Sequence, residues 1–252
     1  MLSWKLFSSK NRKSTEVWNA RTMFGPNLSF AATEAYKLLR TNIMFSLPDE
    51  EECHIIGVTS SVQSEGKSST ACNMAYALAE TGCKVLLLEG DMRRPTLASK
   101  LNLAKSPGLS NLLVSRTDLH ESIQQCTLAP NMDIIISGDI PPNPSELLSS
   151  NRMAKLLEQL KAKYNYIIFD LPPITAVSDA LAVAKQLDGV VMVVRSGVSD
   201  QQILKEAMRQ LELIKVRILG FVYRDSAASK SKYGCSYSKK YYKAYNYDEK
   251  DD

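Results

Sequence analysis

The feature of this chain that most limits its fold is a series of short apolar, β-rich runs with helical patterns between them. Each run is continuously apolar, so both of its faces are expected to be buried. The segments between the runs are long enough for crossover helices. The runs are residues 54–59, 84–89, 132–137, 166–170, 190–195 and 218–223. This pattern predicts an α/β fold, a doubly wound and mostly parallel sheet covered by helices on both faces.

Composition places the chain among ordinary globular proteins. Its 252 residues are 44% hydrophobic and 23% charged, which excludes a wholly disordered or fibrous protein. The longest apolar runs fall far short of the roughly 20 residues that a spanning helix needs. Residues 1–13 lack the apolar region of a secretory signal. We therefore expect a protein that neither crosses a membrane nor is exported.

The cysteines and the net charge indicate where the protein is located and which partners it lacks. The five cysteines are odd in number and form no CxxC pair, which disfavours a disulfide framework and a zinc site. A reducing cytoplasm is the expected location. The net charge of +4 is too weak to indicate a nucleic-acid partner, so we expect none.

Three segments are expected along the chain: an N-terminal extension (1–30), one globular domain (31–225) and a disordered tail (226–252). Residues 31–45 have the pattern of an amphipathic helix that packs outside the sheet. Residues 68–80 lack Pro and Gly and predict a helix that ends at Gly82, which would take a left-handed cap conformation.

Residues 61–68 follow the first run and open that helix. They match the phosphate-loop pattern GxxxxGK[ST] except that Ser61 replaces the first glycine. Such a loop needs inward backbone N–H groups, a lysine for the β and γ oxygens and a hydroxyl for Mg²⁺, which Gly66, Lys67 and Ser68 supply. A chance GKS before an ordinary helix is the alternative. Ser61 is tolerable if it need not adopt positive φ. The predicted ATP-binding residues are Ser61, Val62, Gln63, Ser64, Glu65, Gly66, Lys67, Ser68 and Ser69.

Carboxylates lie at the ends of two other runs: Glu89 ends the second run and Asp91 follows it, and Asp170 ends the fourth. Ligands of an open parallel sheet bind at the carboxyl ends of its strands, so these acids can converge with the loop on one Mg²⁺-nucleotide. A single acid there could equally be a helix cap or a solvated turn. Phosphoryl transfer requires mainly positioning and charge neutralisation. The predicted catalytic residues are Lys67, Glu89, Asp91, Arg93 and Asp170.

Tyrosine is concentrated at the C-terminus. Six of the eleven tyrosines fall in the last twenty residues, and residues 226–252 contain no Val, Ile, Leu, Met, Phe or Trp. A segment of this composition cannot bury enough apolar area to fold. The tyrosines are thus predicted phosphorylation sites, with a low-complexity tail or a stacking surface for single-stranded nucleic acid as alternatives. They are Tyr233, Tyr237, Tyr241, Tyr242, Tyr245 and Tyr247.

Together these motifs resemble the bacterial tyrosine kinases of capsule and exopolysaccharide synthesis, whose P-loop NTPase fold is related to the MinD/ParA ATPases. The Walker A, A′ and Walker B motifs of that family match residues 61–68, 86–93 and 167–172. The resemblance implies an ATP- and Mg²⁺-dependent kinase that phosphorylates its own tail, with the metal held near Ser68, Asp91 and Asp170. Transfer in trans is a hypothesis from length, because a flexible coil of 27 residues can reach a neighbouring subunit. The A′ motif usually reads DxD. Here Glu89 replaces the first aspartate, and whether Glu89 or Asp91 activates the acceptor tyrosine stays open.

Two other functions compete with this one. A MinD/ParA-like ATPase switch would regulate a membrane-associated assembly, but such proteins carry a signature lysine where this chain has Val62. A non-catalytic nucleotide-binding scaffold would require that Ser61 or Glu89 abolish the chemistry. A GTPase is disfavoured because no NKxD-type motif occurs between the late strands.

The resemblance also implies partners. Glu34, Lys37 and Arg40 resemble the family's ExxRxxR oligomerisation motif, with Lys37 replacing the middle arginine, which implies a homo-oligomeric ring. A solvated helix with i,i+3 charge pairs is the alternative. A separate transmembrane adaptor would activate the kinase and hold it at the inner face of the plasma membrane. A cognate tyrosine phosphatase would reverse its action.

Overall fold

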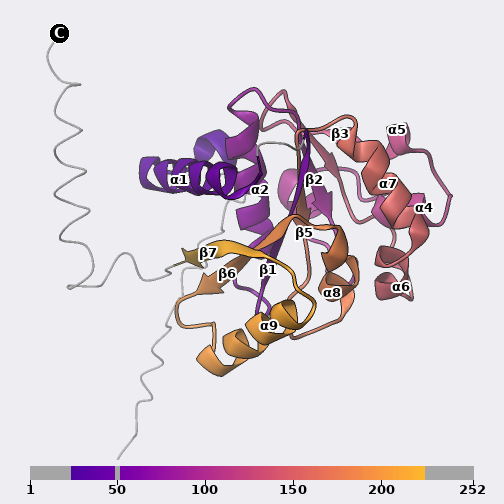
Figure 1. Cartoon of the computed structure of the whole chain (residues 1–252). Coiled ribbons are helices and arrows are strands. Elements are labelled where there is room, and N and C mark those ends of the chain that lie inside the picture. The colour runs from indigo at the N-terminus through magenta and orange to yellow at the C-terminus, as the bar shows by residue number, and fades with distance from the viewer. Residues whose placement is uncertain (1–23, 49–51, 225–252) are drawn as a thin grey trace, which may run out of the picture.

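The computed structural model describes residues 24–48 and 52–224 (Figure 1). The predicted tail and its six tyrosines lie outside the described residues, as do residues 1–23 of the predicted extension. Within the described ranges, no helix combines the length and the apolar character needed to cross a bilayer.

One sheet organises the domain, in the strand order β3-β4-β2-β5-β1-β6-β7. All neighbouring strands are parallel except β3, which pairs antiparallel with β4. The six predicted strands and their parallel arrangement are confirmed, whereas β3, a polar pair of glutamines, was not predicted. The strands are β1 (His54–Ser60), β2 (Val85–Glu89), β3 (Gln124–Gln125), β4 (Met132–Ile135), β5 (Tyr166–Asp170), β6 (Gly189–Arg195) and β7 (Ile218–Arg224).

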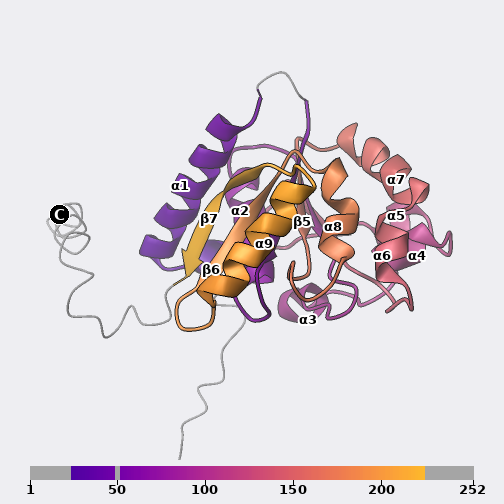
Figure 2. The ribbon, with the colours of Figure 1, turned by 60° about the horizontal axis from the view of Figure 1, so that its bottom comes forward.

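Helices cover both faces of the sheet (Figures 1 and 2). The face covered by α2 also carries α1 and α3. These helices are α1 (Phe30–Ser46), α2 (Lys67–Ala79) and α3 (Leu97–Leu101). The opposite face packs against α4 (Leu109–Leu113), α6 (Pro144–Leu148), α7 (Asn151–Lys161), α8 (Asp179–Val183) and α9 (Gln201–Leu213). Short elements complete the chain: η2 (Gly25–Asn27), α5 (Leu119–Ser122) and η3 (Ala184–Gln186).

Side chains alternate between the two faces of the sheet along each buried strand, so each face has its own hydrophobic core. Ile56 and Val58 of β1 face the α2 side, and Ile55 faces the side of α7 and α9. Every residue of β1, β2 and β5 is buried, which is why the middle of each strand is apolar. Polar residues occur only at the strand ends.

The two helices predicted from sequence form close to their expected bounds. Gly82 has φ 89°, and its N–H donates to Ala79 O at 3.0 Å, which confirms the left-handed position predicted beyond α2. On α1, the hydroxyl of Ser29 accepts from Ala32 N at 3.4 Å. This helix packs on α2 and reaches the edge strand β7, outside the sheet as predicted.

The register brings the chemical groups to one edge of the sheet. Glu89, the last residue of β2, lies beside Asp170, the last residue of β5. On the other side of β1, Arg195 of β6 lies beside Arg224 of β7. The loop that follows β1 lies between these two pairs, because β1 is flanked by β5 and β6.

Candidate active site

The phosphate-binding loop runs from the end of β1 into α2. Its two left-handed residues are Ser64, with φ 65°, and Gly66, with φ 97°. Ser61, which stands where the pattern has glycine, is not among the positive-φ residues. The condition for tolerating Ser61 is therefore met, because its backbone conformation is open to any residue.

Gly66 is favoured by its left-handed conformation, and a Cβ at this position would also displace the Arg224 side chain. A Cβ at this position would lie 1.6 Å from Arg224 Nη1. Directly after it, Lys67, Ser68 and Ser69 form the first turn of α2, where the backbone N–H groups have no partner within the helix. Such N–H groups at a helix N-terminus bind phosphate oxygens.

Lys67 joins the loop to the two neighbouring strand ends. Its Nζ lies 2.7 Å from Asp91 Oδ2 and 3.5 Å from Asp170 Oδ1. Burial alone would lower the pKa of Lys67, but the negative charges of Asp170 and Asp91 hold that pKa above its ordinary value. The lysine is therefore a permanent cation at the point where the sequence places the phosphates.

Asp170 has the character of a metal-supporting acid. It is fully buried, and neither carboxylate oxygen has a hydrogen bond of good geometry within the described residues. Burial raises its pKa, and the neighbouring Lys67 and Ser68 offset this only in part. A buried carboxylate with few hydrogen-bond donors, beside a hydroxyl and a second acid, is an oxygen-ligand set that suits Mg²⁺.

Asp91 is held at the same place from a loop. Its Oδ1 accepts a hydrogen bond from Arg94 N at 3.0 Å, and its Oδ2 faces Lys67. The backbone bond fixes the carboxylate while leaving the second oxygen directed at the lysine.

Glu89 differs from Asp91 in that backbone N–H groups occupy both of its carboxylate oxygens. Its Oε1 accepts from the N–H groups of Thr96 and Leu97, both at 2.7 Å, and its Oε2 accepts from Ser137 N at 3.0 Å. Burial raises the pKa of Glu89, against the effect of the backbone bonds from Leu97 and Ser137. Both oxygens are thus occupied in fixing the start of α3 and the end of β4, and this geometry argues against Glu89 as the base.

Arg93 is also engaged away from the loop. It forms a bidentate pair with Asp179, with Nε at 2.8 Å and Nη2 at 3.1 Å. Asp179 is fully buried and also accepts a hydrogen bond from Ser145. Arg93 therefore ties the β2–α3 loop to α8 and, through Asp179, to α6; within the described residues no hydrogen bond or ion pair links it to the phosphate loop.

Three arginines that the sequence did not single out do contact the loop. Arg94 donates to the Gln63 side chain at 2.7 Å. Arg195 donates to Ser64 O at 2.9 Å, and Arg224 donates to Gly66 O at 3.2 Å. The sequence carried a signal for the last two, because each ends a predicted strand or follows it directly, at the edge where the acids were sought.

Comparison with known proteins assigns the site to a family. A family model described as an AAA domain matches residues 53–218. Tyrosine-protein kinase YwqD of Bacillus subtilis is 37% identical over 226 residues, which are 89% of this chain and 94% of that relative. The chain belongs to the bacterial tyrosine kinases of capsule and exopolysaccharide synthesis.

Further matches support the assignment. Tyrosine-protein kinase CpsD of Streptococcus agalactiae serotype Ia is 34% identical over 202 residues, 80% of this kinase and 85% of the relative. The crystal structure of the chimerical protein CapA2B2 is 35% identical, covers 82% of the kinase and 89% of its own chain, and superposes with a TM-score of 0.74. These matches decide between the functions left open by the sequence: the chain is a tyrosine-protein kinase that regulates capsular and exopolysaccharide synthesis.

A more distant structure supports the fold alone. The septum site-determining protein MinD of Pyrococcus horikoshii, complexed with Mg-ADP, is 22% identical over 68% of the kinase and 70% of its own chain, with a TM-score of 0.58. The predicted P-loop fold related to MinD is thus confirmed, and the kinase is a P-loop NTPase that binds ATP.

The residues predicted at the oligomer interface lie on α1. Lys37 Nζ pairs with Glu34 Oε1 at 2.8 Å, and both side chains are exposed. Arg40 points inward, where its Nη1 donates to Ala77 O of α2 at 2.8 Å. Two members of the motif are thus on the surface of the kinase, and the third has a partner within its own chain.

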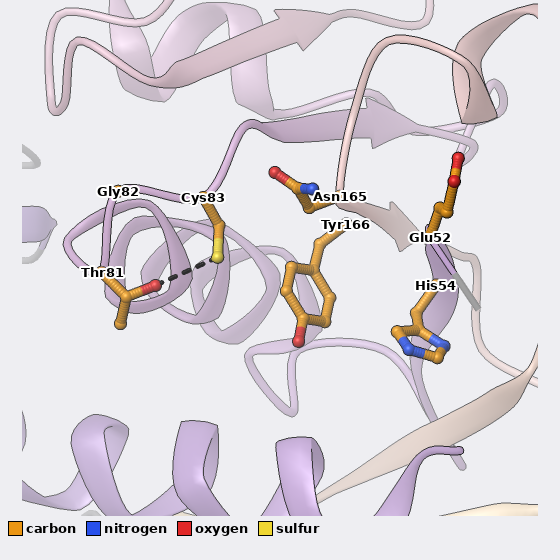
Figure 3. A pocket seen from close by; sticks show the side chains of 7 residues that line it. All are labelled: Glu52, His54, Thr81, Gly82, Cys83, Asn165 and Tyr166. Carbon is orange, nitrogen blue, oxygen red and sulfur yellow. Dashed lines mark hydrogen bonds between the residues drawn. The ribbon is translucent and has the colours of Figure 1, made fainter. Parts of the chain in front are cut away.

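A cavity of about 490 Å³ lies at the opposite edge of the sheet, where the strands begin (Figure 3). It is lined by Glu52, His54, Thr81, Gly82, Cys83, Asn165 and Tyr166. It shares no residue with the phosphate loop and contains no lysine or arginine for phosphates. The chemistry of the kinase is therefore assigned to the loop edge.

Proposed function

We propose that this kinase transfers the γ-phosphate of ATP to the tyrosines of its own tail, and that it does so between subunits. The observation that carries this proposal is the position of Lys67 between Asp91 and Asp170. A cation for the phosphates, an acid for the metal and an acid for the acceptor are the parts that phosphoryl transfer needs.

Asp91 is the proposed base. When the phosphates of ATP compete for Lys67, Asp91 loses its ion-pair partner and can accept a proton. It takes the proton of the tyrosine hydroxyl as the phenolic oxygen bonds to the γ-phosphorus. The bond from that phosphorus to the bridging oxygen breaks, and ADP leaves with the electron pair. Glu89 is not assigned this role because three backbone N–H groups occupy its carboxylate.

The proposed metal site consists of the Ser68 hydroxyl and Asp170, the latter acting through water, with Asp91 beside them. Bound Mg²⁺ would neutralise charge on the β- and γ-phosphates. The buried Asp170 oxygens without hydrogen-bond donors support this assignment. Among the described residues, the cation that forms an ion pair with Asp170 is Lys67, whose Nζ lies 3.5 Å from Asp170 Oδ1.

Transfer between subunits is feasible on length. Arg224, the last described residue before the tail, donates to Gly66 O of the loop at 3.2 Å. A flexible coil of the length of residues 226–252 would have a root-mean-square span of about 30 Å and an extended limit of roughly 90 Å. A tail of that reach could enter the active site of its own subunit or that of another subunit. In a ring, an adjacent active site would always be close by.

The proposed ring uses α1. Besides Glu34, Lys37 and Arg40, this helix exposes apolar side chains, with Phe30 at 58%, Leu38 at 62% and Phe45 at 88% of their area. Apolar groups gathered on one exposed helix support a protein contact there.

A separate transmembrane adaptor is the proposed activator, placing the kinase at the cytoplasmic face of the membrane. The similarity to CapA2B2, a chimera, supports such a partner. A cognate tyrosine phosphatase would reset the tail.

Mixing two variants, one without a working active site and one without tail tyrosines, tests the transfer route. One carries Lys67→Met and an intact tail, and the other has an active site but phenylalanine at all six tail tyrosines. Phosphotyrosine on the first protein, appearing only in the mixture, is expected. Wild-type tail phosphorylation without any signal in the mixture would instead establish transfer within one subunit.

A further inference from the structure

The consensus glycine of the phosphate loop is replaced by a residue whose side chain has a partner. The Ser61 hydroxyl donates to the Glu65 carboxylate, at 3.0 Å from Oε1 and 3.1 Å from Oε2. Both residues are completely buried. The same carboxylate accepts a hydrogen bond from Val62 N at 2.8 Å. Glu65 therefore bonds to the first two residues of the loop in which it lies.

A second segment of the chain reaches the same carboxylate. The hydroxyl of Ser199, in the loop between β6 and α9, donates to Glu65 Oε1. Ser199 Oγ in turn accepts from Arg195 N at 2.7 Å. The Arg195 side chain donates to Ser64 O at 2.9 Å. Two connections thus join the end of β6 and the loop that follows it to the phosphate loop, although these segments are more than 130 residues apart in sequence.

Glu65 depends on these donors because of its burial. Within residues 24–48 and 52–224, no lysine or arginine forms an ion pair with it. A buried carboxylate without a cation requires hydrogen-bond donors to replace its lost hydration. The donors here are Ser61, Val62 and Ser199, so loss of one hydroxyl leaves the group under-satisfied.

The phosphate loop is held both before and at its strained residue, Ser64. Ser64 is left-handed, which costs free energy for a residue with a Cβ. Glu65 fixes the loop before this residue through Val62, and Arg195 fixes its carbonyl. The backbone N–H groups that follow are those that receive phosphate.

We infer that Glu65 is a positioning residue for nucleotide binding, and that Ser61 and Ser199 are the hydroxyl donors that hold its carboxylate in place. Ser61 is then a functional replacement of the consensus glycine, since glycine offers no hydroxyl. The inference rests on ATP binding by the loop and is independent of whether the tail is phosphorylated.

The decisive variant is Ser61→Gly, which restores the consensus pattern. We expect it to raise the Kd of a fluorescent ADP analogue about tenfold, as loss of a hydrogen bond to a charged group would. Ser199→Ala should have an effect of the same direction and similar size. Ser196→Ala is the matched control, because that hydroxyl lies in the same β6–α9 loop and makes no hydrogen bond within the described part of the chain; its Kd should be unchanged.

Kinase assays separate positioning from general damage. The KM for ATP should rise in Ser61→Gly and Ser199→Ala, while kcat at saturating ATP stays within about twofold of wild type. Ser199→Ala keeps the test open should Ser61→Gly fail to fold, because Ser199 is only half-buried. Unchanged or tighter ADP binding in the folded variants would overturn the inference, as would a loss of kcat with an unchanged KM.

Discussion

Lys67 Nζ lies 2.7 Å from Asp91 Oδ2, so the lysine that serves the phosphates is ion-paired with the proposed base. The same lysine is 3.5 Å from the buried Asp170. Binding of ATP therefore redistributes charge among these three groups, because the phosphates compete with both carboxylates for one cation. Substrate binding and release of the base are coupled in this arrangement.

Replacing Asp91 or Glu89, the two acids of the A′ motif, by its amide should distinguish an effect on catalysis from an effect on stability. Asp91→Asn is expected to lower kcat by about 10²- to 10⁴-fold, as removal of a general base does, with little loss of stability. Glu89→Gln should lower the free energy of unfolding by about 1–3 kcal/mol, because its backbone donors lose a charged partner, while folded enzyme keeps its kcat. Steady-state kinetics and urea unfolding on both variants check this, and a reversed pattern would assign the base to Glu89.

Asp170 should make stability depend on pH. Burial raises its pKa above 3.8, so the folded protein binds this proton more tightly than the unfolded chain. Its contribution to stability is full below that value and is lost as pH rises through the raised pKa. Asp170→Asn has no carboxyl group to deprotonate and therefore does not lose this free energy of unfolding. The stability of the variant relative to wild type should rise between about pH 4 and about pH 7. Urea unfolding at the two pH values measures the difference, and a gain that shrinks with pH would contradict the account.

Arg93 should matter for folding through Asp179. Arg93→Ala leaves a fully buried carboxylate without its bidentate partner. We expect a loss of about 2 kcal/mol in the free energy of unfolding, less than for a fully buried pair because the arginine is partly exposed. Adding Asp179→Asn should restore part of this stability. An equal loss in the double variant would show that the ion pair is not the cause.

Arg224 should contribute to nucleotide affinity through the loop. Arg224→Gln removes the guanidinium that donates to Gly66 O, and we expect the Kd for ATP to rise about fivefold, or about 1 kcal/mol. Arg217→Gln is the matched control, because Arg217 is exposed just before the amino end of β7. Equal affinities in the two variants, measured by calorimetry, would remove Arg224 from the site.

Much of the fold could be predicted because burial on two faces leaves a clear mark. The central strands read as continuous apolar runs, and the acids and the phosphate loop follow them at one edge. The loop itself was recognisable because its glycine, lysine and serine lie at a strand-to-helix junction. Short helices such as α3 and α8, each of five residues, carry too few turns to produce a periodic pattern.

The partners of individual side chains could not be predicted in the same way. Glu89 and Asp91 are two residues apart and looked alike, yet Glu89 bonds to Ser137, which is 48 residues away. The pairing of Arg93 with Asp179 spans 86 residues. The partner of each side chain depends on where the short connections place backbone N–H groups and on which acid is buried. The spacing of residues along the sequence gives neither of these.

We propose above that ATP bound at this loop supplies the phosphate of the tail tyrosines. The most direct test of this proposal is to incubate the full chain with Mg·ATP, with and without the adaptor's cytoplasmic segment, and to map phosphotyrosine by mass spectrometry. Lys67→Met should abolish the signal, whereas Lys105→Met, at an exposed lysine distant in sequence from the loop, should not. We predict phosphotyrosine among Tyr233, Tyr237, Tyr241, Tyr242, Tyr245 and Tyr247 that depends on Lys67. Absence of tail phosphotyrosine under both conditions, or a signal that persists in Lys67→Met, would contradict the account.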